Sequence, residues 1–280
     1  MIELKNVGYT YEDNASGRVE AVKDVSVKIE DGEFWGIIGH TGSGKSTLTE
    51  LMSGLLKPTE GSVIVDGIDV KNTKNTVREL KGKVAMVFQY PEHQLFEETV
   101  LKDICFGPKN LGLDENEAIK QAKAAMKLVE LGEEYENLSP FELSGGEKRR
   151  VAIAGILAMK PDVLILDEPT AGLDPAGRDS LIDTLVRIQG EWTKSVVMVS
   201  HSMEDVARCA KKVMVMKKGR LIKSGDVGDV FKDEKLLTDA GLDIPQITRL
   251  MTRLRAEGFE FEDILTVEDA VNAICERIGV

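Results

Sequence analysis

The stretch Gly39–Ser46 constrains the fold of this chain more than any other part of the sequence, because it matches the pattern G-x-x-x-x-G-K-[ST]. It follows the apolar run 34–38 and precedes a helical stretch that begins near Ser46. The glycines let successive backbone N–H groups point toward one anion, and the helix N-terminus adds partial positive charge. A glycine loop that matches by chance is the alternative. We predict a phosphate-binding loop between a buried strand and a helix.

The polar residues of this loop suit a nucleotide that carries Mg²⁺. Lys45 can reach the terminal phosphates, and the Ser46 hydroxyl can ligate the metal ion. The nucleotide-binding residues predicted from this stretch are Gly39, His40, Thr41, Gly42, Ser43, Gly44, Lys45, Ser46 and Thr47.

Strand and helix signals alternate through the first two thirds of the 280-residue chain. This alternation is typical of an α/β fold with a largely parallel sheet. The length favours one large domain, residues 1–240, followed by a small appendage, residues 241–280. Short apolar runs predict buried strands at 34–38, 84–88, 163–166, 196–200 and 213–216.

Four polar residues follow three of these strands. Asp167 and Glu168 come directly after 163–166, Gln89 follows 84–88, and His201 follows 196–200. Because the carboxyl ends of parallel strands lie at one edge of a sheet, these side chains should meet near the phosphate loop. Asp167 then suits Mg²⁺ and Glu168 suits polarisation of a water. A strand-end pair of acids that only caps a turn is the alternative.

Residues of about 90–160 are predicted to form a mainly helical subdomain. Within it, Ser144-Gly145-Gly146-Glu147 has the spacing of a capping box, so a helix should begin there with its N-terminus open to an anion. Reaching the chain's own Lys45 would require a severe fold-back. We therefore expect this second turn to serve the nucleotide of another chain.

The segment after Gly241 changes character. Ile247, Leu250, Met251 and Leu254 form one helical stripe, and Thr266 with Asp269 can cap a second helix. Two interpretations remain open: a helical pair that covers the edge of the sheet, or a dimerisation appendage.

Composition excludes several classes of partner. The net charge of −12 repels a polyphosphate backbone, so nonspecific nucleic-acid binding is not expected. The three cysteines show no C-x-x-C pair and thus no disulfide framework or zinc knuckle. No window approaches the roughly 20 apolar residues of a membrane span. We therefore expect any work at a membrane to depend on partners.

These motifs, taken in order, resemble those of the ATP-binding subunits of ATP-binding cassette (ABC) transporters. The similarity covers about residues 1–230 and includes the signature 143–147 and the D-loop 171–174. It implies a P-loop NTPase core with an antiparallel β edge, two ATP molecules held between two cassettes, and contact of His201 with the γ-phosphate. It also places Tyr11 against adenine, although core or surface packing is the alternative for this residue. Glu147 departs from the usual Gln of the signature.

The segment Gln89–Thr99 is similar to that of ATPases in energy-coupling factor (ECF) transporters, which import vitamins or metal ions. There it receives helices of a membrane scaffold protein; a plain surface loop is the alternative. The phosphate loop and the tail from Asp243 resemble the second of the two ATPase types in that family. The resemblance implies a heterodimer with a related ATPase at the cytoplasmic face of a bacterial membrane. It also implies an indirect link to a membrane substrate-binding subunit, and Mg²⁺ held by Ser46, Gln89 and Asp167.

The same motifs also allow other interpretations of the function. A conventional ABC importer or exporter would use another membrane partner. A soluble ABC ATPase of DNA maintenance needs a long coiled coil or a basic surface, and neither occurs in the sequence. A regulatory module that does not hydrolyse ATP is disfavoured, because Glu168 and His201 are both present.

Overall fold

The computed structural model describes residues 1–13, 17–72, 79–259, 261 and 264–278. A six-stranded sheet in the order β10-β9-β3-β8-β7-β6 forms its centre. From β9 to β6 neighbouring strands run parallel, and β10 is antiparallel to β9. The predicted mainly parallel α/β sheet is confirmed. Its strands are β3 (Phe34–Gly39), β6 (Val84–Val87), β7 (Val163–Asp167), β8 (Ser195–Val199), β9 (Lys212–Lys217) and β10 (Arg220–Asp226).

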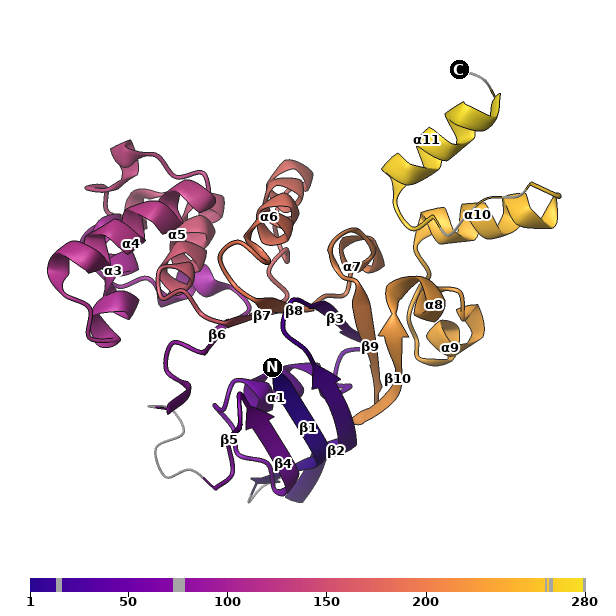
Figure 1. Cartoon of the computed structure of the whole chain (residues 1–280), viewed down its shortest axis with the longest axis horizontal. Coiled ribbons are helices and arrows are strands. Elements are labelled where there is room, and N and C mark those ends of the chain that lie inside the picture. The colour runs from indigo at the N-terminus through magenta and orange to yellow at the C-terminus, as the bar shows by residue number, and fades with distance from the viewer. Residues whose placement is uncertain (14–16, 73–78, 260, 262–263, 279–280) are drawn as a thin grey trace.

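The antiparallel strands form a second, four-stranded sheet in the order β2-β1-β4-β5. Helix α1 (Lys45–Met52) lies between the two sheets (Figure 1). Its Leu48 and Leu51 are fully buried in one apolar cluster with residues of both sheets. The phosphate loop is thus anchored in the centre of the molecule. The strands are β1 (Ile2–Asp13), β2 (Gly17–Ile29), β4 (Glu60–Val65) and β5 (Ile68–Asp69).

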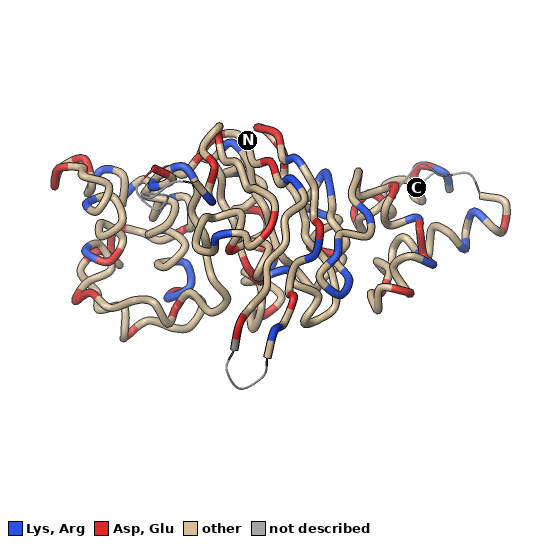
Figure 2. Tube along the Cα trace, turned by 90° about the horizontal axis from the view of Figure 1, so that it is seen from below, with Lys and Arg blue, Asp and Glu red and all other residues tan. Residues whose placement is uncertain are grey.

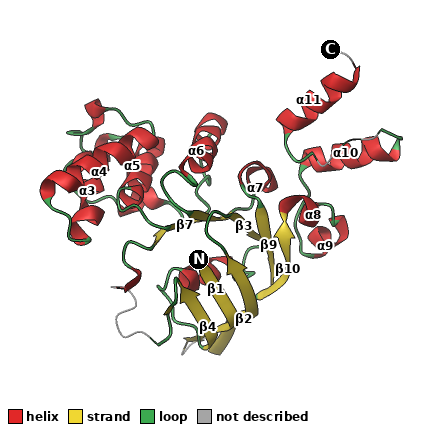
Figure 3. Ribbon diagram, in the orientation of Figure 1, coloured by secondary structure: helices red, strands yellow, loops and turns green. Residues whose placement is uncertain are grey.

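The other face of the central sheet is covered by helices, as Figure 3 shows. Alternation along β3 supplies both cores: Phe34 and Ile38 pack toward the helices, whereas Trp35 and Ile37 pack toward α1. The helices next to this face are α6 (Pro175–Ile188), α7 (Met203–Cys209), α8 (Val227–Phe231) and α9 (Glu234–Asp239).

Helices between β6 and β7 gather at one end of the molecule (Figure 1). Asp114 caps the start of α4 (Glu115–Leu128), because its Oδ1 accepts from the Glu117 N–H at 3.0 Å. The elements are α3 (Val100–Asn110), α4 (Glu115–Leu128), α5 (Gly145–Leu157) and the 3₁₀ turns η1 (Pro91–Gln94), η2 (Glu133–Tyr135) and η3 (Pro140–Glu142).

The last two helices, α10 (Gln246–Ala256) and α11 (Val267–Ile278), project at the opposite end of the molecule (Figure 1). Met251 and Ala270 are buried in a small separate cluster. The predicted cap is present, since the Asp269 N–H donates to Thr266 Oγ1 at 3.2 Å.

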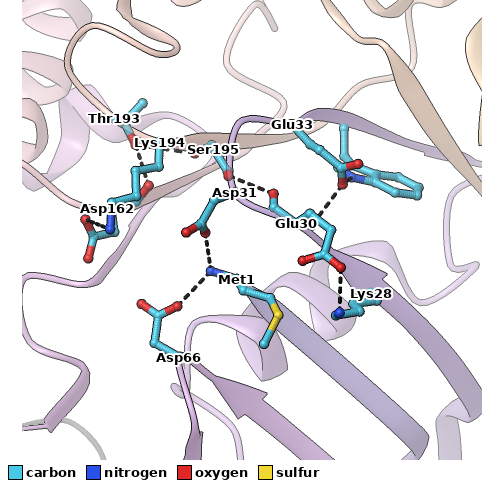
Figure 4. Close-up of polar contacts among 11 residues, drawn as sticks. Met1, Lys28, Glu30, Asp31, Glu33, Asp66, Asp162, Thr193, Lys194 and Ser195 are labelled. Carbon is cyan, nitrogen blue, oxygen red and sulfur yellow. Dashed lines mark hydrogen bonds and ion pairs between the residues drawn. The ribbon is translucent and has the colours of Figure 1, made fainter.

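Polar contacts tie the two sheets together at the amino ends of the parallel strands (Figure 4). The Ser195 hydroxyl donates to the Glu30 carbonyl at 3.1 Å, and the Met1 amino group lies 2.5 Å from Asp31 and 2.8 Å from Asp66. This leaves the carboxyl ends of the strands, at the other edge, for the polar residues predicted there.

Charges of both signs are interspersed along the chain, with no continuous basic stripe among the described residues (Figure 2).

Candidate nucleotide site

The phosphate loop requires glycine at defined positions. Gly44, the N-cap of α1, has φ +100°, and a Cβ there would lie 2.4 Å from the Ala21 carbonyl oxygen. A Cβ on Gly39 would lie 2.5 Å from the Met216 carbonyl oxygen. At Gly42, φ is +77° and a Cβ would meet open space. The loop is therefore packed tightly against the sheets on one side and open on the other, which suits a cradle for phosphate.

Lys45 lies within this cradle. Its Nζ donates to the carbonyl oxygens of Gly39 at 2.8 Å and His40 at 3.2 Å, and the residue is 6% exposed. Burial lowers the pKa of Lys45, and the nearby Glu168 and Asp167 oppose that shift. A phosphate group would give this buried ammonium the strong anionic partner that the loop carbonyls do not provide.

The loop also contains a buried side-chain hydroxyl group that makes no hydrogen bond with the described residues. Ser43 Oγ is one of the buried side-chain polar atoms for which the described residues supply no hydrogen bond. Buried polar atoms without partners are uncommon, because leaving them unsatisfied costs free energy. The residues present therefore fit an anionic ligand of the size of a phosphate.

Asp167 ends β7 beside the first residues of α1. It is 8% exposed, and burial raises the pKa of its carboxyl group, while a hydrogen bond from Ser46 acts in the opposite direction. The predicted pair of Ser46 and Asp167 is thus brought together. Among the described residues there is no cluster of three or more His, Cys, Asp or Glu side chains that could hold a metal. A magnesium ion at this place would need the oxygen atoms of the nucleotide as further ligands.

Glu168 joins the predicted residues from the two neighbouring strands. Its Oε2 accepts from Gln89 Nε2 at 3.0 Å, and its Oε1 lies 2.6 Å from His201 Nε2. Its backbone is in the left-handed region, with φ +50°. Each carboxylate oxygen thus has one protein partner and keeps a further lone pair that could accept a hydrogen bond from a water.

Tyr11 lies next to the loop from the antiparallel sheet. Its hydroxyl is 3.2 Å from Thr47 Oγ1 and 3.5 Å from Glu50 Oε2, and its ring packs edge-on to Tyr9. The residue is 39% exposed, so a ring face remains accessible for stacking. No sequence pattern indicated that Glu50 would lie at this site. Its pKa is raised by burial and by the charge of Asp167.

The second turn has the predicted capping box. Ser144 Oγ accepts from the Glu147 N–H at 3.4 Å, and Glu147 Oε2 accepts from the Ser144 N–H at 2.8 Å. The other oxygen, Oε1, accepts from the Tyr135 hydroxyl at 2.9 Å. These contacts lower the pKa of Glu147, the Ser144 interaction being the largest cause. A Cβ on Gly145 or Gly146 would meet open space, so this helix N-terminus is accessible.

The turn belongs to α5, at the end of the molecule formed by the helices between β6 and β7. Lys45, Asp167, Glu168, Gln89 and His201 converge at the carboxyl edge of the sheet instead. Within the described residues, no hydrogen bond joins Ser144, Gly145 or Gly146 to the phosphate loop.

A cavity of about 240 Å³ lies beside the loop. His40 and His201 line one side of it, and residues 241–244 line another. The start of the 241–280 segment therefore lies next to the nucleotide loop, a proximity that no sequence pattern indicated.

A family model described as "ABC transporter" matches residues 22–171, which include the loop, the second turn and Glu168. The Energy-coupling factor transporter ATP-binding protein EcfA2 of Clostridium acetobutylicum is 50% identical over 275 residues, 98% of this chain and 96% of the relative. EcfA2 of Clostridium tetani is 51% identical over 96% of this chain and 94% of the relative. This chain belongs to the ABC transporter family, among the ECF transporter ATP-binding proteins.

Solved structures agree with this assignment. The cbiO1 protein from Clostridium perfringens, described as part of the ABC transporter complex cbiONQ, superposes with a TM-score of 0.75. It is 35% identical and covers 90% of this chain and 98% of its own. The ATP-binding cassette MJ0796, in a dimeric post-hydrolysis state bound to ADP and Pi, gives a TM-score of 0.74 at 31% identity, over 81% of this chain and 99% of its own.

The prediction of an ABC ATPase of the ECF type, of its second kind, is therefore confirmed, and so is the P-loop NTPase fold. The chain binds ATP and serves as the ATP-hydrolysing subunit of a transporter, in association with membrane components. None of the helices in the described ranges combines the length and hydropathy of a membrane span.

Proposed function

We propose that this chain hydrolyses Mg²⁺-bound ATP between itself and a second, related ATPase, at the cytoplasmic face of a bacterial membrane. The observation that carries the proposal is the convergence of Lys45, Asp167, Glu168, Gln89 and His201 at one edge of the sheet. The anion-accepting turn at Ser144 is absent from that cluster, so each site needs the turn of a neighbouring subunit.

Nucleotide binding would rearrange contacts that the protein now makes with itself. Lys45 would exchange the Gly39 and His40 carbonyls for phosphate oxygens. His201 would turn from Glu168 to the γ-phosphate, which frees a carboxylate oxygen to polarise the attacking water. Ser46, Gln89 and Asp167 would hold Mg²⁺, whose charge stabilises the transferring phosphoryl group.

Glu147 is compatible with this scheme. Its carboxylate would repel a triphosphate if it pointed at the partner's site, but it is turned back to the Ser144 N–H and the Tyr135 hydroxyl. Hydrogen bonds to both oxygens spread and neutralise part of its charge. The backbone N–H groups at Gly145 and Gly146 can then serve the partner's nucleotide.

The chain is proposed to comprise an ABC nucleotide-binding domain, residues 1–240, with its helical subdomain at about 90–160. Residues 241–280 form the appendage. Its Leu250, Val267 and Val271 are 43%, 63% and 53% exposed, although the appendage has a core of its own. We assign this apolar surface to contact between the two ATPases, because a helical pair that merely covered the sheet would bury it.

The segment Gln89–Thr99 is proposed as the docking surface for the membrane scaffold protein, through which the substrate-binding subunit is reached. Its Tyr90 and Phe96 are 46% and 56% exposed, and Phe96 packs edge-on against the half-exposed Phe106. These exposed aromatic side chains flank the 3₁₀ turn η1, and exposed aromatic residues are typical anchors of a protein interface.

Two variants test the sandwich directly. Ser144→Arg in this chain should leave its own ATP binding intact but reduce hydrolysis of the ATPase pair at least tenfold, because the partner's nucleotide loses the turn. ATP-dependent dimerisation, followed by light scattering in a Glu168→Gln background, should occur with the related ATPase and not with this chain alone. Unchanged turnover in the Ser144→Arg pair would contradict the proposal.

Docking is tested separately. Phe96→Asp should release this chain from membranes that contain the scaffold protein, whereas Val19→Asp, at a 52% exposed position on β2, should not. Equal retention of both variants in the membrane fraction would contradict the assignment of Gln89–Thr99.

A further inference from the structure

The guanidinium of Arg149 lies at a junction of three segments. Arg149 is in the second turn of α5, directly after the capping box, and is 4% exposed. Its Nε and Nη2 donate to Glu92 at 3.1 and 2.9 Å, and its Nη1 donates to the carbonyl oxygens of Pro169 and Ala171 at 3.1 and 2.5 Å. One side chain thus joins the signature helix, the proposed docking segment and the residues that follow Glu168.

Glu92 completes the junction from the docking segment. It lies in η1, its side chain is 15% exposed, and Arg149 holds both of its oxygens in a bidentate pair. Burial acts to raise the pKa of Glu92, but the hydrogen bonds and charge of Arg149, a backbone hydrogen bond and the charge of His93 together lower it. The two hydrogen bonds from Arg149 fix the carboxyl group in one orientation.

The same docking segment has a second attachment to the residues after β7. Gln89, which lies three positions before Glu92, donates a hydrogen bond to the Glu168 side chain. Residues 168–171 are consequently held at Glu168 by Gln89 and at Pro169 and Ala171 by Arg149. Any displacement of 89–92 must move this short stretch with it or break these polar contacts.

Residues 168–171 are held from the opposite side as well. The Thr170 hydroxyl donates to Asp205 Oδ2 at 2.9 Å, and Asp205 is 5% exposed. Ser202, next to His201, accepts from the Asp205 N–H at 3.1 Å, and Arg178 of α6 donates to Asp205 Oδ1 at 2.7 Å. The loop that carries His201 is therefore tied to Thr170 just as the docking segment is tied to Pro169 and Ala171.

We propose that Arg149 and Glu92 are positioning residues that make Gln89–Thr99, the signature helix and residues 168–171 move as one body. Through them, docking of the scaffold protein sets the distance between Glu168 and His201 and thereby the rate of hydrolysis. The inference rests on the proposed function of this site. Its physical basis is that breaking one partner of a buried ion pair leaves an uncompensated charge, so the pair transmits displacement rather than yielding to it.

The test uses the complete transporter in lipid nanodiscs, with Mg²⁺-ATP as the probe. Glu92→Gln keeps the shape of the side chain and removes its charge, Glu92→Asp keeps the charge, and Arg149→Lys keeps a cation that cannot reach all four acceptors. Glu136→Gln is the matched control, because Glu136 forms a 2.8 Å ion pair with Lys123 in the same helical region and is 13% exposed.

We expect Glu92→Gln and Arg149→Lys to lower kcat for ATP about tenfold while KM for ATP stays within about twofold. Glu92→Asp should recover part of the loss, and the double variant should be no slower than either single one. Hydrogen exchange in the free subunit should become faster at residues 170–174 and 202–205 in these variants. Glu136→Gln should change neither quantity.

The inference is overturned if Glu92→Gln has the wild-type kcat, if Glu136→Gln loses as much activity, or if exchange at 170–174 is unchanged. The inference would also be overturned if the losses of kcat in Glu92→Gln and Arg149→Lys added fully in the double variant. Failure of the proposed function looks different: the wild-type complex would then lack ATP turnover, and the exchange measurement on the free subunit would still decide for or against Arg149 and Glu92.

Discussion

Replacement of Glu168 by Gln isolates the charge of the carboxylate from its shape. The amide oxygen can still accept from Gln89 and the amide nitrogen can donate to His201 Nε2, so the contacts of the side chain can be kept, but an amide cannot act as a base. A positioned general base contributes about 10²- to 10⁴-fold to a rate, so kcat should fall by that factor. KM for ATP should change by less than about twofold, since Lys45 and Ser46 remain in place.

The assay is ATP turnover by the complete transporter, with nucleotide binding measured by equilibrium titration of the subunit. Glu191→Gln serves as a matched control, because Glu191 is an exposed glutamate in a loop away from the site. It should retain the wild-type kcat. A folded Glu168→Gln variant that hydrolyses ATP at more than about a tenth of the wild-type rate would refute the role given to Glu168.

Three further predictions concern the same site. Gly44→Ala should lower the melting temperature, measured by calorimetry, by roughly 4–8 °C. The left-handed φ of +100° and the 2.4 Å approach of the new Cβ to the Ala21 carbonyl oxygen together should cost about 2 kcal/mol of stability. Tyr11→Phe should leave KM for ATP within about twofold, and Tyr11→Leu should raise it about tenfold in titrations, because stacking needs only the ring. Burial raises the pKa of Asp167, and Mg²⁺ requires the ionised form. Mg²⁺ affinity should therefore fall as pH decreases, by about tenfold per unit below that pKa, which activity at varied Mg²⁺ would show.

The fold and much of the site could be predicted from the sequence because their causes are local. A short apolar run followed by Gly39–Ser46 defines a buried strand, a turn and a helix start. The carboxyl ends of parallel strands share an edge, so the sequence predicts that Asp167, Glu168, Gln89 and His201 lie together. The capping box at Ser144 likewise depends on residues only three apart.

Local patterns were less accurate at the strand ends. The predicted strand 84–88 ends at Val87, and 196–200 occurs as Ser195–Val199. Phe88 and Ser200 belong instead to the turns that carry Gln89 and His201. Apolar periodicity does not specify where the ladder of hydrogen bonds stops, because that point is set by the neighbouring strand.

The sequence by itself predicted which residues could bind phosphate and determined which polar residues follow the strands, since each motif is contained within a few positions of the chain. Only the tertiary structure decided that Arg149 joins Glu92 to Pro169 and Ala171, and that residues 241–244 lie beside His40. The contacts of Arg149 join residues that are 20 to 57 positions apart in the sequence. His40 and residues 241–244 are separated by still more of the chain. The existence of these contacts depends on how helices and sheets pack, and an isolated arginine or glutamate carries no local signal of its distant partner.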